Sequence, residues 1–306
     1  MNTLFRRLAM FPLLLLVISF LAFVLVRLAP GGPFDKERKP ASPEIERALL
    51  ARYHLDEPVP RQYLRFLAGL ARGDFGASLK YRNHTVTDIL TQGLPVSLTL
   101  GALAFLLAIG LGLPAGFYGA LRYGEWSEYG ASVLILLAVC VPGFVIGPIL
   151  VMVFAIRTGW FPVALWESPW HMVLPTVSLG IYFAGKVARL MREGMRQVLG
   201  MEFIVTARAK GLSETAVLLR HAFRLAVNPV VSYSGPMLAD LLTGSFVVEN
   251  LFQIPGIGVF MVNSSLNRDY PMVVGLVLLY AILLLGLNLA VDFAYRVIDP
   301  RIRHEG

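Results

Sequence analysis

A stretch rich in basic and helix-forming residues lies at 206–229 of this 306-residue chain, between two strongly apolar runs. The stretch reads TARAKGLSETAVLLRHAFRLAVNP and carries five basic residues and one acid, Glu214. A loop held to lipid headgroups would account for the bases alone. Attachment to lipid headgroups does not, however, require as many helix-forming residues as this stretch contains. We therefore expect this stretch to dock into a cavity on a soluble partner.

No residue pattern points to an enzyme. Gly185-Lys186 lacks both the upstream glycine and the Ser or Thr of a phosphate loop. GLGLPAG (110–116) lies inside an apolar run, whereas a dinucleotide fingerprint joins a strand to a helix. No Ser, His and acid set stands out, and Cys140, the only cysteine, sits in an apolar run. We expect no catalytic residue, metal site or cofactor in this chain.

The composition indicates a polytopic helical membrane protein. The chain is 56% hydrophobic and only 15% charged, and a span needs about 20 mostly apolar residues. Its net charge of +7 is explained better by basic cytoplasmic loops than by nucleic acid, since no basic stripe interleaved with aromatics occurs. The fold class is all-α, with six expected spans at about 8–28, 96–120, 131–156, 173–194, 226–248 and 272–295.

The basic residues of short loops predict the orientation. Six spans place both termini on one side, and the side richer in Lys and Arg is cytoplasmic. The opposite short loops carry only Arg157 and Arg268. We therefore expect both termini in the cytoplasm and residues 29–95 outside. The bases of the cytoplasmic side are Arg6, Arg7, Arg122, the cluster from Lys186 to Arg224, Arg296, Arg301 and Arg303.

The predicted organisation has three parts. Residues 1–28 form an uncleaved N-terminal anchor, and 29–95 a small helical extracytoplasmic subdomain. Residues 96–306 form a five-helix core with a cytoplasmic loop at about 200–224. In the subdomain, SPEIERALLARYHL (42–55) begins with a Ser cap and a Pro, and PVPRQYLRFLAGLARGDFG (58–76) repeats apolar residues at helical spacing until Gly73.

Small residues recur every fourth position in the second span. Such a face lets another helix approach closely, so a packing seam is favoured over a ligand site. The residues are Ala108, Gly112, Gly116 and Ala120.

The basic stretch predicts two short helices around a turn. Phe203, Ile204 and Ala207 lie on one side of the first helix. Gly211 follows and can adopt a positive φ. Ser213 caps the second helix, which runs from Glu214 to about residue 225, with acids near its start and bases near its end.

This segment resembles the coupling loop of ATP-binding-cassette importer permeases. The general family pattern, E-A-A-x-x-x-G, is met only at Ala207 and Gly211, but the peptide branch reads T-A-R-A-K-G-L followed by H-A. Further similar pieces cover essentially the whole chain: RLAPGGPF (27–34), YHLDEPVPRQY (53–63), GDFGAS (73–78), PVSLTLGA (95–102), IPGIG (254–258), LNRDYP (266–271) and VIDPRIR (297–303). The match is to the B-type permease of oligopeptide and dipeptide importers.

The resemblance implies a type I importer permease in a bacterial cytoplasmic membrane, forming half of a peptide pathway. It implies a second permease subunit, two ATPase subunits that bind ATP and Mg, and an extracytoplasmic binding protein. Permeases for nickel or another small solute share much of the pattern, and an ion-coupled carrier is a more distant alternative. Contact with the ATPase would fall to Thr206, Ala207, Arg208, Ala209, Lys210, Gly211, Leu212 and His221.

Two further sites follow from sequence. Asp240 lies inside the fifth span, where an acid is costly and faces a cavity or a partner. It either meets a peptide amine in the pathway or pairs with a base on a neighbouring helix. For Asp292, with Arg296 one turn on, we favour structural pairing. After the fifth span, Glu249, Pro255, Gly256 and Gly258 lie in a turning segment, interpreted through the resemblance as an outer gate or docking site.

Overall fold

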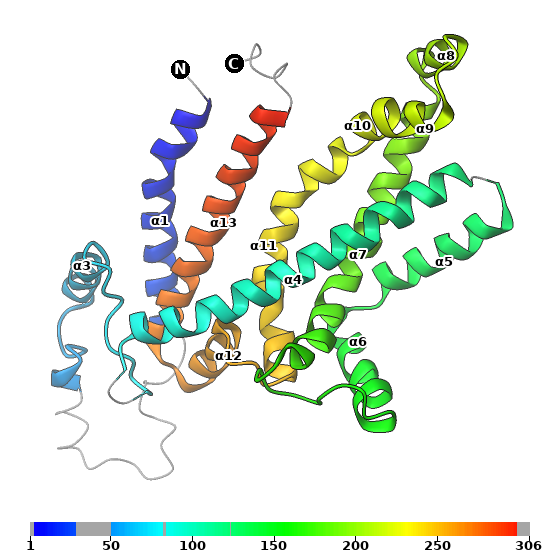
Figure 1. Cartoon of the computed structure of the whole chain (residues 1–306). Coiled ribbons are helices and arrows are strands. Elements are labelled where there is room, and N and C mark those ends of the chain that lie inside the picture. The colour runs from blue at the N-terminus through cyan, green and yellow to red at the C-terminus, as the bar shows by residue number, and fades with distance from the viewer. Residues whose placement is uncertain (1–2, 29–49, 82–83, 123, 299–306) are drawn as a thin grey trace. The chain divides into compact units, whose positions relative to one another are not determined.

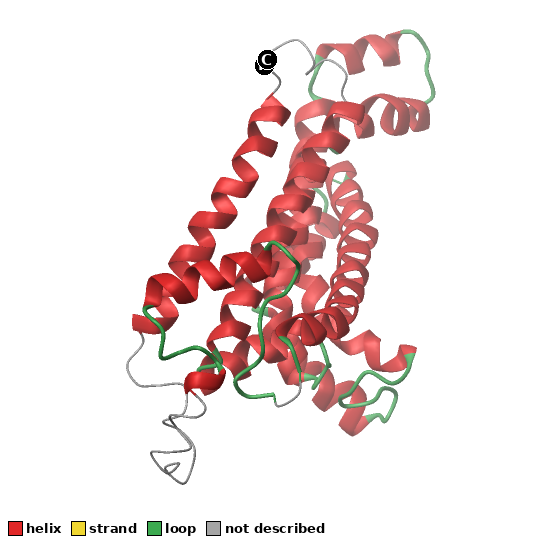
Figure 2. Ribbon diagram, turned by 90° about the vertical axis from the view of Figure 1, so that its left-hand side faces the viewer, coloured by secondary structure: helices red, strands yellow, loops and turns green. Residues whose placement is uncertain are grey.

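The structure, a computed structural model, describes residues 3–28, 50–81, 84–122 and 124–298. In these ranges the chain folds into helices joined by loops and contains no strand, only one isolated antiparallel bridge between Ala77 and Thr85 (Figure 2). Contacts divide it into two units. Of the described residues, one unit comprises those up to Ser97 and Pro255–Gly286, and the other comprises those from Leu98 to Ile254 and from Leu287 onward.

The first unit contains α1 (Thr3–Leu28), α3 (Val59–Leu70), the start of α4 (Val86–Leu121), α12 (Ile257–Asn267) and most of α13 (Tyr270–Ile298). Its core gathers buried side chains of α4, α12 and α13, among them Leu90, Ile257 and Met272. The α1 and α13 helices lie side by side in it (Figure 1), and Ala22 of α1 packs with Val274 and Leu278 of α13.

The expected helix at 58–76 forms as α3 and lies against α1. The Tyr63 ring contacts Phe20 and Phe23, and its hydroxyl lies 2.9 Å from that of Ser19. The helix ends at Leu70, and Gly73 takes φ +76° in the turn that follows. The helix expected at 42–55 lies mostly outside the described residues.

The second unit contains the rest of α4 and α13 and every helix between α4 and α12. Its α7 helix contacts α5, α6, α10 and α11 (Figure 1). The helices are α5 (Trp126–Cys140), α6 (Gly143–Leu150), the π-helix η1 (Val151–Arg157), α7 (Pro169–Leu199), α8 (Glu202–Ala209), α9 (Glu214–Ala216), the π-helix η2 (Val217–Ala222), α10 (Phe223–Ala226) and α11 (Asn228–Leu251).

The helices differ from the expected spans in two places. α4 begins ten residues before the expected start at 96. The third span, expected as one helix over 131–156, is broken, because Val141 and Pro142 are extended and α6 begins at Gly143. Three described helical segments are long and apolar enough to cross a membrane: Ala9–Leu28, Val86–Leu121 and Tyr270–Ala290. The count of six spans stays a prediction.

The small residues of α4 form the expected packing seam, and the neighbour is α7. Ala108 and Ala120 are buried. A Cβ added to Gly116 would lie 2.2 Å from the Ala188 carbonyl oxygen, and one on Gly112 would lie 2.7 Å from Val187. In lipid no hydrophobic effect drives helices together, so such backbone contact is what joins them.

We expect Gly116→Ala to destabilise the protein, because its Cβ would overlap the α7 backbone. Overpacking of this kind costs about 1–3 kcal/mol. Gly110→Ala is the matched control on the same helix, since nothing lies within 4 Å of its added Cβ. The measurement is the thermal midpoint of the detergent-solubilised protein. Equal midpoints for the two variants would show that the seam is not tightly packed.

Candidate functional site

The basic stretch folds as a helical hairpin, here called the basic hairpin (residues 202–226). Its first arm is α8, and its second arm is the continuous run α9, η2 and α10. Both arms lie beyond the ends of α7 and α11 (Figure 1). The two expected helices are therefore confirmed, with one unpredicted feature: the second arm winds as a π-helix at Val217–Ala222. Such turns are rare and are often found at functional sites.

The turn between the arms is a Schellman motif. Gly211 takes φ +76°, as the sequence predicts. Its N–H donates to the Arg208 carbonyl at 2.9 Å, and the Leu212 N–H donates to the Ala207 carbonyl at 3.4 Å. Ser213 then accepts from the Ala216 N–H at 3.4 Å, the expected cap. The backbone fixes the angle between the arms through these bonds.

An ion pair joins the arms across the turn. Arg208 donates to both oxygens of Glu214, at 2.6 and 3.1 Å. These hydrogen bonds, and the positive charge behind them, hold the pKa of Glu214 below its usual value. Both groups are exposed, so solvent screens the pair and its role is geometric. It joins the end of the first arm to the start of the second.

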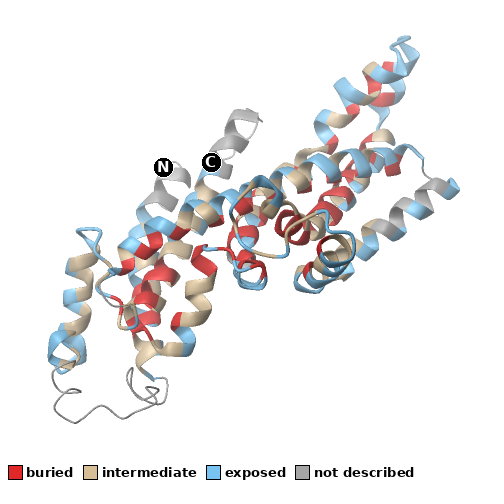
Figure 3. Ribbon diagram, turned by 60° about the horizontal axis from the view of Figure 1, so that its bottom comes forward, coloured by how far each residue is buried: buried red, intermediate tan, exposed pale blue. Residues whose placement is uncertain are grey.

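Burial separates an inner and an outer face of the basic hairpin. Ile204, Ala207, Val217 and Ala222 are buried, whereas Phe203 is 37% exposed, which corrects its expected place beside Ile204. The ribbon of the chain is coloured by burial in Figure 3. The exposed residues of the basic hairpin include five with large apolar side chains: Phe203, Val205, Leu212, Leu219 and Leu225. Exposed apolar groups gathered on a rigid element mark an interaction surface. Of the predicted contact residues, Ala207 is buried, whereas Thr206, Arg208, Ala209, Lys210, Gly211, Leu212 and His221 are exposed.

The basic hairpin is joined to α7 by close backbone packing. Gly194 lies near the end of α7, and its added Cβ would lie 2.4 Å from the Ala226 carbonyl oxygen. Ala226 is the last residue of α10, and α11 begins two residues later. A displacement of the hairpin would therefore act on both α7 and α11.

Sequence reasoning missed a site on these two helices. Lys186 was assigned to the cytoplasmic bases, but it lies inside α7, about 20 Å before the helix ends at 1.5 Å per residue. Its ammonium lies 4.5 Å from the ring centre of Tyr182 and 5.6 Å from that of Tyr233 on α11. Lys186 lies within the expected span at 173–194 although it was counted with the cytoplasmic bases, and the sequence does not show that its neighbours are aromatic.

Asp240 is exposed on α11, in the same unit as Lys186. Seven residues separate it from Tyr233, which places the two on one face of the helix, about 10 Å apart along its axis. The side chains of Asp292 and Arg296 lie outside the described residues.

The predicted outer residues fall into the two units. Glu249 is fully buried near the end of α11, where it accepts from the Ser245 hydroxyl at 2.7 Å. That burial gives Glu249 a structural position rather than a surface for docking. In the other unit Pro255 is exposed, whereas Gly256 and Gly258 are buried at the start of α12. There the Ile257 N–H donates to Ser97 of α4 at 2.9 Å.

A buried carboxylate holds the chain before α13. Asp269 has no exposed surface and accepts from the Ser78 hydroxyl, and from the Leu79 and Lys80 N–H groups at 3.1 and 3.3 Å. It also accepts from the Met272 N–H at 3.4 Å, in the first turn of α13. One side chain thereby joins the 78–81 loop to the junction of α12 and α13.

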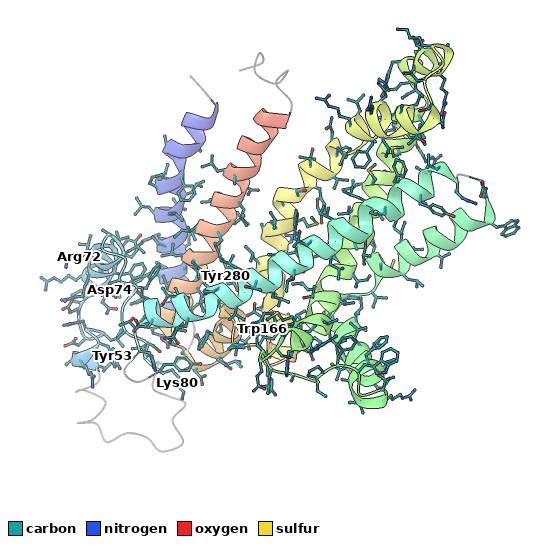
Figure 4. The ribbon with its side chains drawn as sticks, viewed as in Figure 1. Tyr53, Arg72, Asp74, Lys80, Trp166 and Tyr280 are labelled. Atoms are coloured by element: carbon teal, nitrogen blue, oxygen red, sulfur yellow. The ribbon has the colours of Figure 1, made fainter. Side chains whose placement is uncertain are left out.

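The 50–79 segment, together with α1 and the start of α13, lines a partly open cavity of about 270 Å³ in the first unit. Figure 4 labels Tyr53 and Asp74, which line it. Ligand pockets run from about 300 to 1,000 Å³. The Arg27 guanidinium in its wall already donates to Gln62 at 2.7 Å. The cavity is therefore a gap beneath a packed segment rather than a substrate site.

Comparison with known proteins defines the class. Residues 112–304 match the family of binding-protein-dependent transport system inner membrane components. Over 301 residues the chain is 43% identical to the oligopeptide transport system permease protein OppB of Haemophilus influenzae, with 98% of each chain covered. It is 41% identical over 289 residues to the dipeptide transport system permease protein DppB of Bacillus subtilis, with 94% of each covered. The chain belongs to this family of membrane permeases, and the resemblance expected from its sequence is confirmed.

Solved structures agree on the fold. A chain of the MetNI methionine ABC transporter in an inward-facing conformation superposes with a TM-score of 0.59 at 17% identity, covering 69% of this chain and 96% of that one. An amino acid ABC transporter gives 0.52 at 18% identity, covering 69% and 94%. The all-α importer-permease fold is thus confirmed.

We expect Asp269→Ala to destabilise the protein strongly, since it leaves a buried hydroxyl and several N–H groups without their acceptor. Each such loss costs about 1–3 kcal/mol, and several degrees of thermal midpoint should be lost. Asp74→Ala is the control in the same segment, because Asp74 is exposed and accepts only a local bond from the Gly76 N–H. A midpoint for Asp269→Ala within a degree of the control would contradict the anchoring role.

Proposed function

We propose that this chain is a permease subunit of an ATP-driven importer and forms half of the path of oligopeptides or dipeptides across the cytoplasmic membrane. The proposal rests mainly on the basic hairpin. It is an exposed projection at the ends of α7 and α11, and its two arms are held together by backbone hydrogen bonds and an ion pair. Identity of 41–43% to oligopeptide and dipeptide permeases over nearly the whole chain supports the substrate class.

The partners follow from that role. A second permease would complete the pathway, and two ATPase subunits would bind ATP and Mg and receive the basic hairpin. A binding protein would deliver the substrate from outside. This chain itself would hold no cofactor and carry out no hydrolysis. Exposed apolar side chains on Phe203, Val205 and Leu219 would enter the ATPase cavity, with Arg208, Lys210 and His221 around them.

The remaining predicted residues take their places on this basis. Asp240 would line the pathway from α11. The exposed Pro255 and the buried Gly256 and Gly258 would shape the outer gate, while Glu249 holds the end of α11. Both termini and the basic hairpin would face the cytoplasm of a bacterium, with residues 29–95 outside.

The proposal is tested by gentle purification of the tagged chain from native membranes, followed by mass spectrometry and an ATPase assay. We expect a second permease and two ATPase chains, with ATP turnover that a peptide-loaded binding protein stimulates. Recovery of the folded chain alone, with no ATPase, would instead favour a carrier or a channel.

We expect Gly211→Asp to leave the protein in the membrane but to uncouple ATP hydrolysis from uptake. Nothing lies within 4 Å of the added Cβ, so the hairpin can still fold, although φ +76° strains any side chain. The new carboxylate would stand at the tip that enters the ATPase. The measurement is peptide uptake per ATP hydrolysed in proteoliposomes, which should fall at least roughly ten-fold, the equivalent of about 1.4 kcal/mol.

The matched control is Gly200→Asp. Gly200 is also exposed, at the end of α7, but has an ordinary φ of −84° and no close contact. Full coupled uptake by Gly211→Asp, or an equal loss in Gly200→Asp, would count against the hairpin as the lever.

A further inference from the structure

Lys186 forms no ion pair. None of the ion pairs between described side chains involves it, and the acid that acts on the site is Asp240, through its electrostatic effect on Tyr233. Its neighbours are aromatic: Tyr182 and Tyr233, with the Phe183 ring centre 5.8 Å away. Their faces attract a cation by about 0.5–2 kcal/mol, but an aromatic ring carries no charge that could neutralise the ammonium.

A second group at the same place lacks an acceptor. The Tyr233 hydroxyl is buried, and its proton finds no acceptor among the described residues, although buried hydroxyls are nearly always hydrogen-bonded. The Lys186 ammonium faces the hydroxyl oxygens of Tyr182 and Tyr233, which can accept from it but cannot neutralise its charge. A carboxylate beside both groups would supply a counter-ion to Lys186 and an acceptor to the Tyr233 proton.

Asp240 has the opposite sign and lies on the Tyr233 face of α11, about 10 Å farther along the axis. An extended peptide spans about 3.3–3.6 Å per residue, so the separation matches about three residues. The features common to all unmodified linear peptides are an ammonium at one end and a carboxylate at the other. A permease that transports peptides of many different sequences can bind these two ends without contacting the side chains of the peptide.

We infer that Lys186, with the Tyr233 hydroxyl, receives the C-terminal carboxylate of a peptide in transit, while Asp240 receives its amino group. This inference rests on the proposed function and adds how the substrate is recognised. Contact at the two ends alone stays weak enough for release, because it uses few atoms. The site would bind through charge and place little demand on side-chain size.

The test compares uptake of one tripeptide in two forms, with a free C-terminal carboxylate and as the C-terminal amide. The complete importer is reconstituted in proteoliposomes, and the binding protein's affinity for each form is measured separately. We expect wild type to favour the free acid beyond the binding protein's own preference. Lys186→Gln should lower that acid-to-amide ratio roughly ten-fold, the value of a lost charge-assisted hydrogen bond, and Lys186→Arg should retain most of it.

Matched variants separate recognition from structure. Arg189→Gln removes a positive charge three residues along α7 from an exposed side chain paired with Glu193, and should leave the ratio unchanged. Tyr233→Phe removes only the hydroxyl and should lower the ratio several-fold, so it tests the site even if Lys186→Gln fails to assemble. Asp240→Asn should instead weaken the preference for a free over an acetylated amino terminus.

The outcomes are distinct. Wild type that imports no peptide would refute the proposed function itself. Two results would overturn the terminal-carboxylate site and leave the importer assignment intact. One is equal uptake of the free acid and the amide by wild type. The other is a Lys186→Gln variant whose uptake of the two forms falls in the same proportion.

Discussion

Backbone contact between α7 and its neighbours is the constraint on which the second unit depends. Gly112 and Gly116 bring α4 against α7, and Gly194 brings α7 against the end of α10. Because lipid tails are as apolar as the side chains they touch, association in a membrane rests on van der Waals contact and hydrogen bonds. Any side chain at these crossings would separate the helices. α7 is therefore held along its length, and its two functional regions cannot move independently of it.

The basic hairpin is also held rigid by contacts between its own elements. A short two-helix projection would be marginal in isolation, since helices under about 12 residues are not stable alone in water. Here the Schellman bonds at Gly211, the Arg208–Glu214 pair and the buried Ile204 and Val217 fix the arms together. A flexible projection would absorb an applied displacement in its own bending, whereas a braced one passes it to α7 and α11.

The sequence predicted features that local chemistry dictates. The four-residue spacing of small side chains on α4, the positive φ at Gly211 and the Ser213 cap each depend on a few neighbouring residues, and all three are confirmed. The break at Pro142 was missed, because hydropathy stays high across it and a Pro within a span is often tolerated. The role of Asp269 was hidden for another reason: its partners at 78–80 are about 190 residues away in sequence.

Lys186 shows the limit of one-dimensional reasoning most clearly. A base near the end of an apolar run belongs, by the statistics of charged loops, to the cytoplasmic surface. The expected span at 173–194 already contains Lys186, but only the structure shows that its ammonium lies against the rings of Tyr182 and Tyr233. The same two helices that carry Lys186 and Tyr233 end at the basic hairpin, joined at Gly194 and Ala226. A small shift of one helix against the other would change the distance between ammonium and hydroxyl. The Lys186 ammonium and the Tyr233 hydroxyl can bind one peptide carboxylate together only while they stay close. A displacement of the hairpin that separates them would therefore weaken binding and release the peptide.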